Sequence, residues 1–283
     1  MEAALLGAQS AGRNRGPRRE PDRFGRTDQG ATTGRHHRKF GTVEPLTRLP
    51  QTIQLSSDFV HRLHIKELKS HMDVSILFEN LPILTDLGII YGHRRVGMDY
   101  ERSMFGMKNA DATCLAKAIK YKAELLTMID LSSNLMDDDK LRLLVTGLLD
   151  NDTVTHIDVS HNRIADRGAR ALARLLGETS VITSLNLCDN EIHGEGGKAL
   201  GRVLTHNRSL LSLNMRLNRL GDDGGRLLAE GLRANRALRE LNCCGNALAV
   251  EVRRIPMRSQ ISAFSHTLMA LTGSKIPVPG IRK

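Results

Sequence analysis

Apolar and polar residues follow a frame that recurs every 28 residues through the middle of the chain. One position of the frame is always an asparagine: Asn134, Asn162, Asn190, Asn218 and Asn246. Apolar residues stand five and three positions before each asparagine, and another stands two positions after it. A fixed period of this size predicts a solenoid, in which each unit packs against its neighbours.

Each unit is expected to hold one strand and one helix. The two apolar residues before the asparagine are separated by one residue, an alternation typical of a strand. Apolar residues then recur at helical spacing, as at Leu172, Leu175 and Leu176. The frame L-x-x-L-x-L-x-x-N-x-L is that of leucine-rich repeats. The predicted fold class is therefore an α/β leucine-rich-repeat solenoid with 28-residue repeats, resembling the horseshoe of ribonuclease inhibitor.

Three kinds of polar or small residue have predicted structural roles. The repeated asparagines are expected to be buried and to bond backbone groups where the chain leaves the strand, because an amide both donates and accepts. Asp138, Asp166 and Asp222 stand where helix N-caps belong. Early helix glycines at the same period, Gly168, Gly196 and Gly224, predict close approach of neighbouring backbones.

The residues that flank the inward strand positions should form columns on an open face. The first column is Met128, His156, Ser184, Ser212 and Glu240, the second is Asp130, Asp158, Asn186, Asn214 and Asn242, and the third is Ser132, Ser160, Cys188, Arg216 and Cys244. The candidate partner-binding residues on this face are Asp130, Asp158, Asn186, Asn214 and Arg216. Their charge changes from acidic to basic along the array, which would orient a partner.

The frame also occurs upstream, at Leu84, Leu87 and Ile89, but the next asparagine is delayed by an insertion at residues 92–107. The insertion contains Tyr100, Arg102 and Phe105, side chains of the types enriched at interfaces, and these are further candidate partner-binding residues. The alternative, a loop that only covers the first repeats, stays open.

The flanks lack the repeat. Residues 1–50 show no apolar period and are predicted to be a disordered basic tail. Residues 51–83 are predicted to form a helical N-terminal cap on the array at 84–248, which holds about six repeats. Residues 249–283 are predicted to form a C-terminal cap helix, with Ile261, Phe264, Leu268 and Leu271 on one face, and a second basic tail.

Charge and composition restrict the classes of partner. The net charge of +10 comes from the flanks, since residues 1–50 and 249–283 each carry +5 and the array segment 126–248 carries −1. Basic tails favour loose contact with an acidic partner such as a microtubule, and no signature of specific nucleic-acid binding occurs. No apolar stretch is long enough to predict a membrane span. Four cysteines without a C-x-x-C pair indicate a reducing, cytoplasmic compartment.

The sequence predicts no catalytic residues, no cofactor and no metal site. The run Gly194–Lys198 departs from the phosphate-binding loop, because Ile192 lies where that pattern has glycine and Ala199 follows the lysine. The acidic run Asp137–Asp139 is interpreted as a helix N-terminus rather than a metal site. We therefore expect a binding protein and not an enzyme.

Several segments resemble one family of repeat proteins. Asp137–Asp150 and Ile157–Leu172 resemble the leucine-rich-repeat subunit of the nexin–dynein regulatory complex, the t-complex-associated testis-expressed protein 1 family. Ile76–Pro82 and Val96–Met107 look like the irregular first repeat of that family, and Arg216–Arg219 with Asp222–Gly225 look like a later repeat. The resemblance covers roughly residues 70–248, beyond which the family has more repeats and this chain departs from it.

The resemblance implies a non-enzymatic scaffold of the cytoskeleton in the axoneme of a cilium or flagellum. The implied partners are other subunits of the dynein regulatory complex, with doublet microtubules contacted through the basic tails. Two alternatives remain open. One is a regulator of a small GTPase resembling the Ran GTPase-activating protein, although that family ends in an acidic tail and this chain ends basic. The other is a generic cytosolic leucine-rich-repeat binding module.

Overall fold

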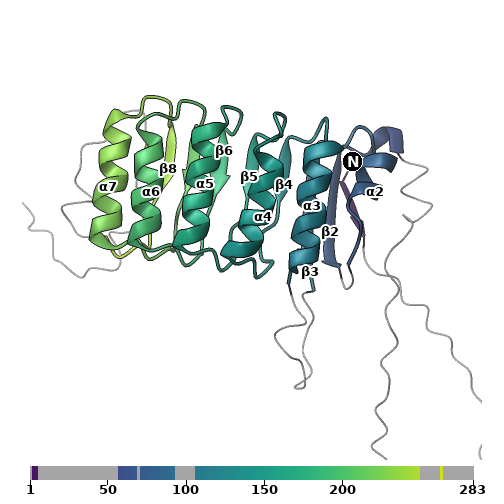
Figure 1. The fold of residues 1–283 in the computed structure, drawn as a ribbon, viewed down its shortest axis with the longest axis horizontal. Helices are drawn as coiled ribbons and strands as arrows, with labels where there is room; N and C mark the ends of the chain where they lie inside the picture. Colours follow the sequence, from purple (N-terminus) through teal and green to yellow (C-terminus); the bar gives the residue numbers. More distant parts are fainter. Residues whose placement is uncertain (1, 6–56, 69–70, 93–105, 249–261, 264–283) are drawn as a thin grey trace, which may run out of the picture. The chain divides into compact units, whose positions relative to one another are not determined.

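Figure 1 shows a computed structural model of the chain, which describes residues 2–5, 57–68, 71–92, 106–248 and 262–263. The chain divides into two compact units, and one of them, residues 6–44, lies outside the described residues. The other unit, residues 1–5 with 45–283, contains all the helices and strands described below.

Parallel strands form a single sheet in which they lie in chain order. The strands are β1 (Glu2–Leu5), β2 (Arg62–Leu68), β3 (Asp86–Tyr91), β4 (Met128–Asp130), β5 (His156–Asp158), β6 (Ser184–Asn186), β7 (Ser212–Asn214), β8 (Glu240–Asn242) and β9 (Ser262–Ala263). The helices are a 3-10 turn η1 (Ser57–Phe59), α2 (Ser75–Asn80), α3 (Asn109–Tyr121), α4 (Asp138–Leu148), α5 (Asp166–Glu178), α6 (Gly194–Leu204) and α7 (Gly221–Ala234). Helices α3–α7 stand side by side as a layer over one face of the sheet (Figure 1).

The strands align at the repeat period. Ile129, Ile157, Leu185 and Leu213 are the middle residues of β4–β7 and pair across neighbouring strands. All four are buried between the sheet and the helices, while the residues on either side of them remain partly exposed or exposed. The predicted fold class is confirmed: the chain forms an α/β leucine-rich-repeat solenoid of alternating parallel strands and helices.

The repeated asparagines form a buried ladder between units. The amide nitrogen of Asn162 donates to the carbonyl oxygens of Leu131 and Val159 at 3.0 Å each. Its amide oxygen accepts from the backbone N–H groups of Asn134 and Met136 at 2.9 Å each. Asn190, Asn218 and Asn246 likewise each donate to a carbonyl oxygen of the preceding unit and accept from one of its backbone N–H groups. Each amide therefore satisfies backbone groups of two units, as its predicted structural role requires.

The residue before each ladder asparagine has a left-handed backbone. Ser133, His161, Asp189 and Leu217 have φ angles of 58°, 55°, 54° and 55°, and Gly245 has 73°. Such a conformation costs a residue with a side chain about 1–2 kcal/mol. The chain needs it here to turn sharply from strand to helix, and the buried asparagine bonds hold the turn.

The prediction that Asp138 and Asp166 cap their own helices, α4 and α5, is wrong. Each is the first residue of its own helix rather than the residue before it, and its carboxylate accepts hydrogen bonds from the next repeat. Asp138 accepts from the N–H of Ala165 at 2.7 Å, and Asp166 accepts from those of His193 and Gly196 at 2.9 and 2.7 Å. The cap of α4 is Asp137, which accepts from the N–H of Lys140.

The early helix glycines make room for these carboxylates. A Cβ at Gly168 would lie 2.6 Å from Oδ1 of Asp138, and one at Gly196 would lie 2.7 Å from Oδ1 of Asp166. The close backbone approach predicted at these positions is found at Gly224, where a Cβ would lie 2.8 Å from Cα of Gly194.

Several predictions about the flanks are wrong where the structure describes them. The helical cap predicted for 51–83 contains the strand Arg62–Leu68, which pairs with β3, and its α-helix is limited to Ser75–Asn80. Leu63 and Ile65 alternate inward like Leu87 and Ile89, so strand pairing prevails over the helical spacing. Glu2–Leu5, expected to be disordered, pair with β2, and Ser262–Ala263, expected to be helical, pair with β8. The remaining predictions for 6–56, 249–261 and 264–283 lie outside the described residues.

Candidate functional site

The sheet presents the predicted columns on the side opposite the helices. Pairing aligns Met128, His156, Ser184, Ser212 and Glu240 in one row, and Asp130, Asp158, Asn186, Asn214 and Asn242 in a second. The sheet thereby brings Asp130, Asp158, Asn186 and Asn214 together on neighbouring strands, with Arg216 two residues after Asn214. Tyr100, Arg102 and Phe105 lie outside the described residues.

The second column also shapes the turns that follow the strands. Asp130 and Asp158 accept from the backbone N–H groups of Ser132 and Ser160 at 2.9 Å each. Asn186, Asn214 and Asn242 make the same bond to the residue two positions later, at 3.1 Å each. A carbonyl or carboxylate oxygen is therefore needed at every position of this column. The other polar atom of each side chain is left to face neighbouring strands or solvent, as in the 2.8 Å bond from Nδ2 of Asn186 to Oδ2 of Asp158.

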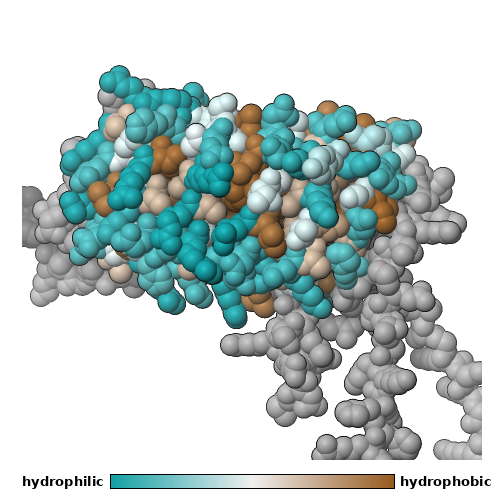
Figure 2. All heavy atoms as spheres, in the orientation of Figure 1, coloured by the Kyte–Doolittle hydropathy of each residue, from teal (hydrophilic) through white to brown (hydrophobic). Residues whose placement is uncertain are grey.

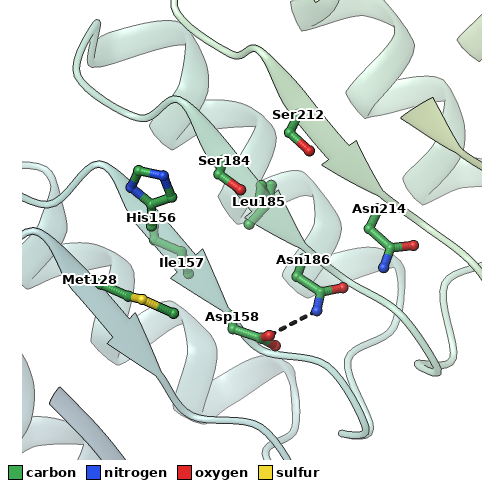
Figure 3. A pocket seen from close by; sticks show the side chains of 9 residues that line it. All are labelled: Met128, His156, Ile157, Asp158, Ser184, Leu185, Asn186, Ser212 and Asn214. Atoms are coloured by element: carbon green, nitrogen blue, oxygen red, sulfur yellow. Dashed lines mark hydrogen bonds between the residues drawn. The ribbon is translucent and has the colours of Figure 1, made fainter. Parts of the chain in front are cut away.

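An open hollow of about 260 Å³ lies over β4–β7. Figure 3 shows its two rows, with His156, Ser184 and Ser212 in one and Asp158, Asn186 and Asn214 in the other. The hollow exists because two short serines follow the larger His156 and precede Glu240. Hydroxyl, amide and carboxylate groups line it beside the apolar Met128, so the hollow can take one polar side chain with an apolar stem.

His64 lies beside Asp130, at the acidic end of this face. Its Nδ1 lies 4.0 Å from Oδ2 of Asp130, two strands away. The intervening residue is Gly88, where a Cβ would lie only 2.3 Å from Nδ1 of His64. The sequence interpretation missed His64 because it treated this segment as helical. A signal was present in Val60, Leu63 and Ile65, which repeat the spacing of Leu84, Leu87 and Ile89.

Arg216 and Cys188 are neighbours in the third column. Burial raises the pKa of the Cys188 thiol, and the guanidinium of Arg216 offsets this only in part. The thiol is therefore protonated at neutral pH and is a poor nucleophile. Leu217, the next residue, is 43% exposed in its left-handed backbone conformation, so an apolar side chain stands beside the arginine at this rim.

A second polar cluster lies where residues 71–73 contact the start of helix α3. The sequence interpretation missed it. Nδ1 of His71 lies 2.5 Å from Oδ1 of the buried Asp111, whose Oδ2 accepts from the N–H of Lys108. Cys114 donates to Asp73 at 3.2 Å, and burial raises the pKa of its thiol. Burial, together with the nearby Asp111, also raises the pKa of Tyr91. The His71–Asp111 and Cys114–Asp73 contacts join segments 71–73 and 108–114. The buried Tyr91 hydroxyl has no hydrogen-bond partner among the described residues, and neither the protonated thiol nor the phenol is an activated nucleophile.

The three residues of the acidic run Asp137–Asp139 have separate structural roles. Asp137 caps α4, Asp138 bonds the next repeat, and Asp139 pairs with Arg167 at 3.4 Å. Within the part of the chain that the structure describes, no group of three His, Cys, Asp or Glu residues could hold a metal ion. No helix of the described residues is both long enough and apolar enough to cross a bilayer.

Comparison with known proteins identifies the repeats. A family profile described as "Leucine Rich repeat" matches residues 150–173, 180–201 and 206–229. Dynein regulatory complex subunit 5 of Chlamydomonas reinhardtii is 48% identical over 104 residues, which are 36% of this chain and 26% of that protein. The mouse protein of the same name, from Mus musculus, is 36% identical over 83 residues, 29% of this chain and 16% of that protein.

Among solved structures, leiomodin-1 actin-binding site 2 matches with a TM-score of 0.43 and 26% identity, over 47% of this chain and 78% of that one. The matched segments span about a quarter or less of the two curated relatives. The repeat profile, the parallel strand–helix units and the identity to both relatives lead to one conclusion. The chain is a leucine-rich-repeat protein related to dynein regulatory complex subunit 5.

Proposed function

We propose that this chain is a non-enzymatic scaffold subunit of the axonemal nexin–dynein regulatory complex, where it contributes to the regulation of ciliary or flagellar motility. The observation that carries the proposal is the 48% identity over 104 residues to a protein named as a subunit of that complex. Its partners are other subunits of the complex, and its basic flanks add contacts to doublet microtubules. Its location is accordingly the axoneme.

The sheet face supports binding as the mode of action. Its polar groups are fixed before any partner arrives, because the second column is bonded to the turns that follow each strand. Preorganised groups lose little entropy on association. The burial that raises the pKa values of the Cys114 and Cys188 thiols also favours a role without covalent chemistry.

The proposed binding surface comprises the hollow over β4–β7, the acidic Asp130 and Asp158 before it, and Arg216 after it. A partner side chain enters between His156 and Glu240, where Ser184 and Ser212 leave space. Complementary charge then fixes the direction of the partner along the array. Tyr100, Arg102 and Phe105 of the insertion add anchors to this surface.

The test fills the hollow and reverses the charge at its rim. The test variant is Ser184→Arg with Arg216→Glu, because neither side chain makes a hydrogen bond or ion pair with a described residue. Replacing Asp158 would also remove its bond to the N–H of Ser160, which shapes the turn after β5. Ser180→Arg with Arg236→Glu is the matched control, since it makes the same substitutions at exposed positions in the helix-to-strand loops. Both variants and the wild type are expressed in ciliated cells that lack the endogenous relative, and the amount in isolated axonemes is measured.

We expect the control to assemble at the wild-type level and the sheet-face variant to fall at least about tenfold, as for loss of roughly 1.4 kcal/mol of affinity. Equal assembly of both folded variants would show that the partner binds another surface. Tyr100→Ala with Arg102→Ala tests the insertion in the same assay, and assembly at the wild-type level would remove these residues from the surface.

A further inference from the structure

Helices α4–α7 carry a row of basic residues at the repeat period. Arg142, Arg170, Lys198 and Arg226 occupy equivalent positions on the four helices, and all four side chains reach the surface. Positions four residues further along share the same helix face and hold Thr146, Arg174, Arg202 and Glu230. Six of these eight positions are basic and one is acidic. We call Arg142, Arg170, Arg174, Lys198, Arg202 and Arg226 the basic belt.

The repeat pattern by itself does not require basic residues at exposed helix positions. The row that lies three residues earlier on the same helices is exposed at all four positions, yet it contains Asp139, Arg167, Glu195 and Asp223. Exposure alone therefore permits either charge at such positions. Of these two rows, only the one through Arg142, Arg170, Lys198 and Arg226 is basic on all four helices. Figure 2 shows this helical face, on which hydrophilic side chains alternate with hydrophobic ones.

The excess positive charge is centred on α5 and α6. Arg174 and Lys198 pair with Glu178 and Glu195 at 2.7 Å each, and Arg226 pairs with Glu230 at 3.5 Å. Arg170 and Arg202 make no ion pair with any residue that the structure describes. The hydrogen-bonded ammonium of Lys198, and to a smaller extent the charges of Arg170 and Arg202, lower the pKa of the Glu195 carboxyl.

We propose that the basic belt binds an acidic, extended segment of a partner protein that runs across helices α4–α7. Neighbouring packed helices lie about 8–10 Å apart, so the belt spans roughly 30 Å. An extended chain covers that distance with about nine residues. The eight positions contain no aromatic side chain on which nucleic-acid bases would stack, which favours a polypeptide. The surface lies on the opposite side from the sheet-face hollow, and the proposal stands independently of the function proposed for that face.

The experiment measures binding of a fluorescein-labelled peptide of about ten glutamates to the purified full chain by fluorescence anisotropy. The belt variant is Arg170→Glu with Arg202→Glu. The matched control is Arg163→Glu with Arg219→Glu, which makes the same change of net charge at exposed positions in the strand-to-helix turns. Because the basic flanks are present in all three proteins, differences between them report the belt alone. Circular dichroism and thermal unfolding establish that each variant is folded.

The belt variant should bind the peptide about tenfold more weakly than the wild type, a change of roughly 1.4 kcal/mol, while the control stays within about twofold. Binding of the wild type should weaken as salt rises. Equal losses in the two variants would assign binding to net charge, and no loss in the belt variant would assign it to the flanks; either result overturns the proposal. Tighter belt-dependent binding of a DNA duplex than of the peptide would overturn the choice of a polypeptide.

Discussion

At the scale of single residues, two hydrogen-bonding columns join one repeat to the next, a buried one of asparagines and a more exposed one of threonines. Besides the asparagine ladder, Thr127, Thr155 and Thr183 donate through Oγ1 to the carbonyl oxygens of Thr85, Thr127 and Thr155, at 3.2, 3.2 and 3.3 Å. The asparagines were predictable, because a buried amide at a fixed period has few other uses. The threonines share the period, but threonine is common at solvent-facing strand positions, so the sequence pattern did not single them out.

Replacing Asn190 by alanine should destabilise the array without altering its surface. The change removes donation to Val159 and acceptance from Ile164, at 3.0 and 3.1 Å, and leaves buried backbone groups unpaired. We expect a loss of about 1–3 kcal/mol in the free energy of unfolding, measured by denaturant titration. Leu187→Ala should cost more, about 2–5 kcal/mol, through a core cavity. The adjacent exposed Glu191→Ala is the control, and an Asn190→Ala midpoint equal to the control would contradict the structural role.

The adjacent Cys243 and Cys244 should differ in reactivity. Burial raises the pKa of the Cys243 thiol to about 12, whereas Cys244 is partly exposed. A thiol whose pKa is raised stays protonated in the folded state, so at pH 8 only Cys244 of this pair should be alkylated. Tandem mass spectrometry of the native protein after brief iodoacetamide treatment distinguishes the two. Equal modification of Cys243 in the folded chain would mean that the last described repeat opens readily.

At the scale of elements, helix starts depend on the preceding repeat. The aspartates at the first position of α4 and α5 bond backbone groups that begin α5 and α6. The sequence pattern identified these aspartates but not the groups that they bond. A shift of one residue at the start of a helix decides whether the carboxylate bonds its own helix or the next one. The strand Arg62–Leu68 was missed for a related reason, since short apolar runs satisfy helical and strand spacing alike.

Asp166→Ala should therefore weaken α6 rather than α5. Loss of the bonds to His193 and Gly196 should cost about 0.5–2 kcal/mol, as for an N-cap. Hydrogen exchange should show the loss of protection at the start of α6. The control is Asp139→Ala, which removes only exposed ion pairs. Faster exchange confined to α5 would indicate that Asp166 stabilises its own helix.

Helix α6 begins with Gly194, at the position that Asp138 and Asp166 occupy in α4 and α5. An aspartate can therefore be introduced there. A Cβ at Gly194 would lie 3.5 Å from the carbonyl oxygen of Leu220 and 3.7 Å from the nitrogen of Gly224, which is ordinary contact. Gly194→Asp should supply the missing cap for α7 and raise the free energy of unfolding by about 0.5–1 kcal/mol. Gly194→Ala separates helix propensity from capping, and equal stability of the two variants would rule out the cap.

At the scale of the whole molecule, a strand face with a shaped hollow and a helical face with a basic belt give the chain two distinct surfaces. The period and the apolar frame were enough to predict the fold. They did not predict the hollow, which depends on two serines following a histidine, or the contact of His64 with Asp130 across Gly88. Such features depend on which side chains meet across strands, and a repeat pattern specifies only which positions meet.

The most direct test of the account is the partition of the wild-type chain in fractionated cilia. Epitope-tagged chain is expressed in ciliated cells, membranes are removed with detergent, and the axonemes are then extracted with high salt. The account predicts that the chain stays with the detergent-extracted axonemes, leaves them in high salt, and co-precipitates there with other subunits of the dynein regulatory complex. Release of the chain with the detergent-soluble proteins, without those subunits, would contradict it.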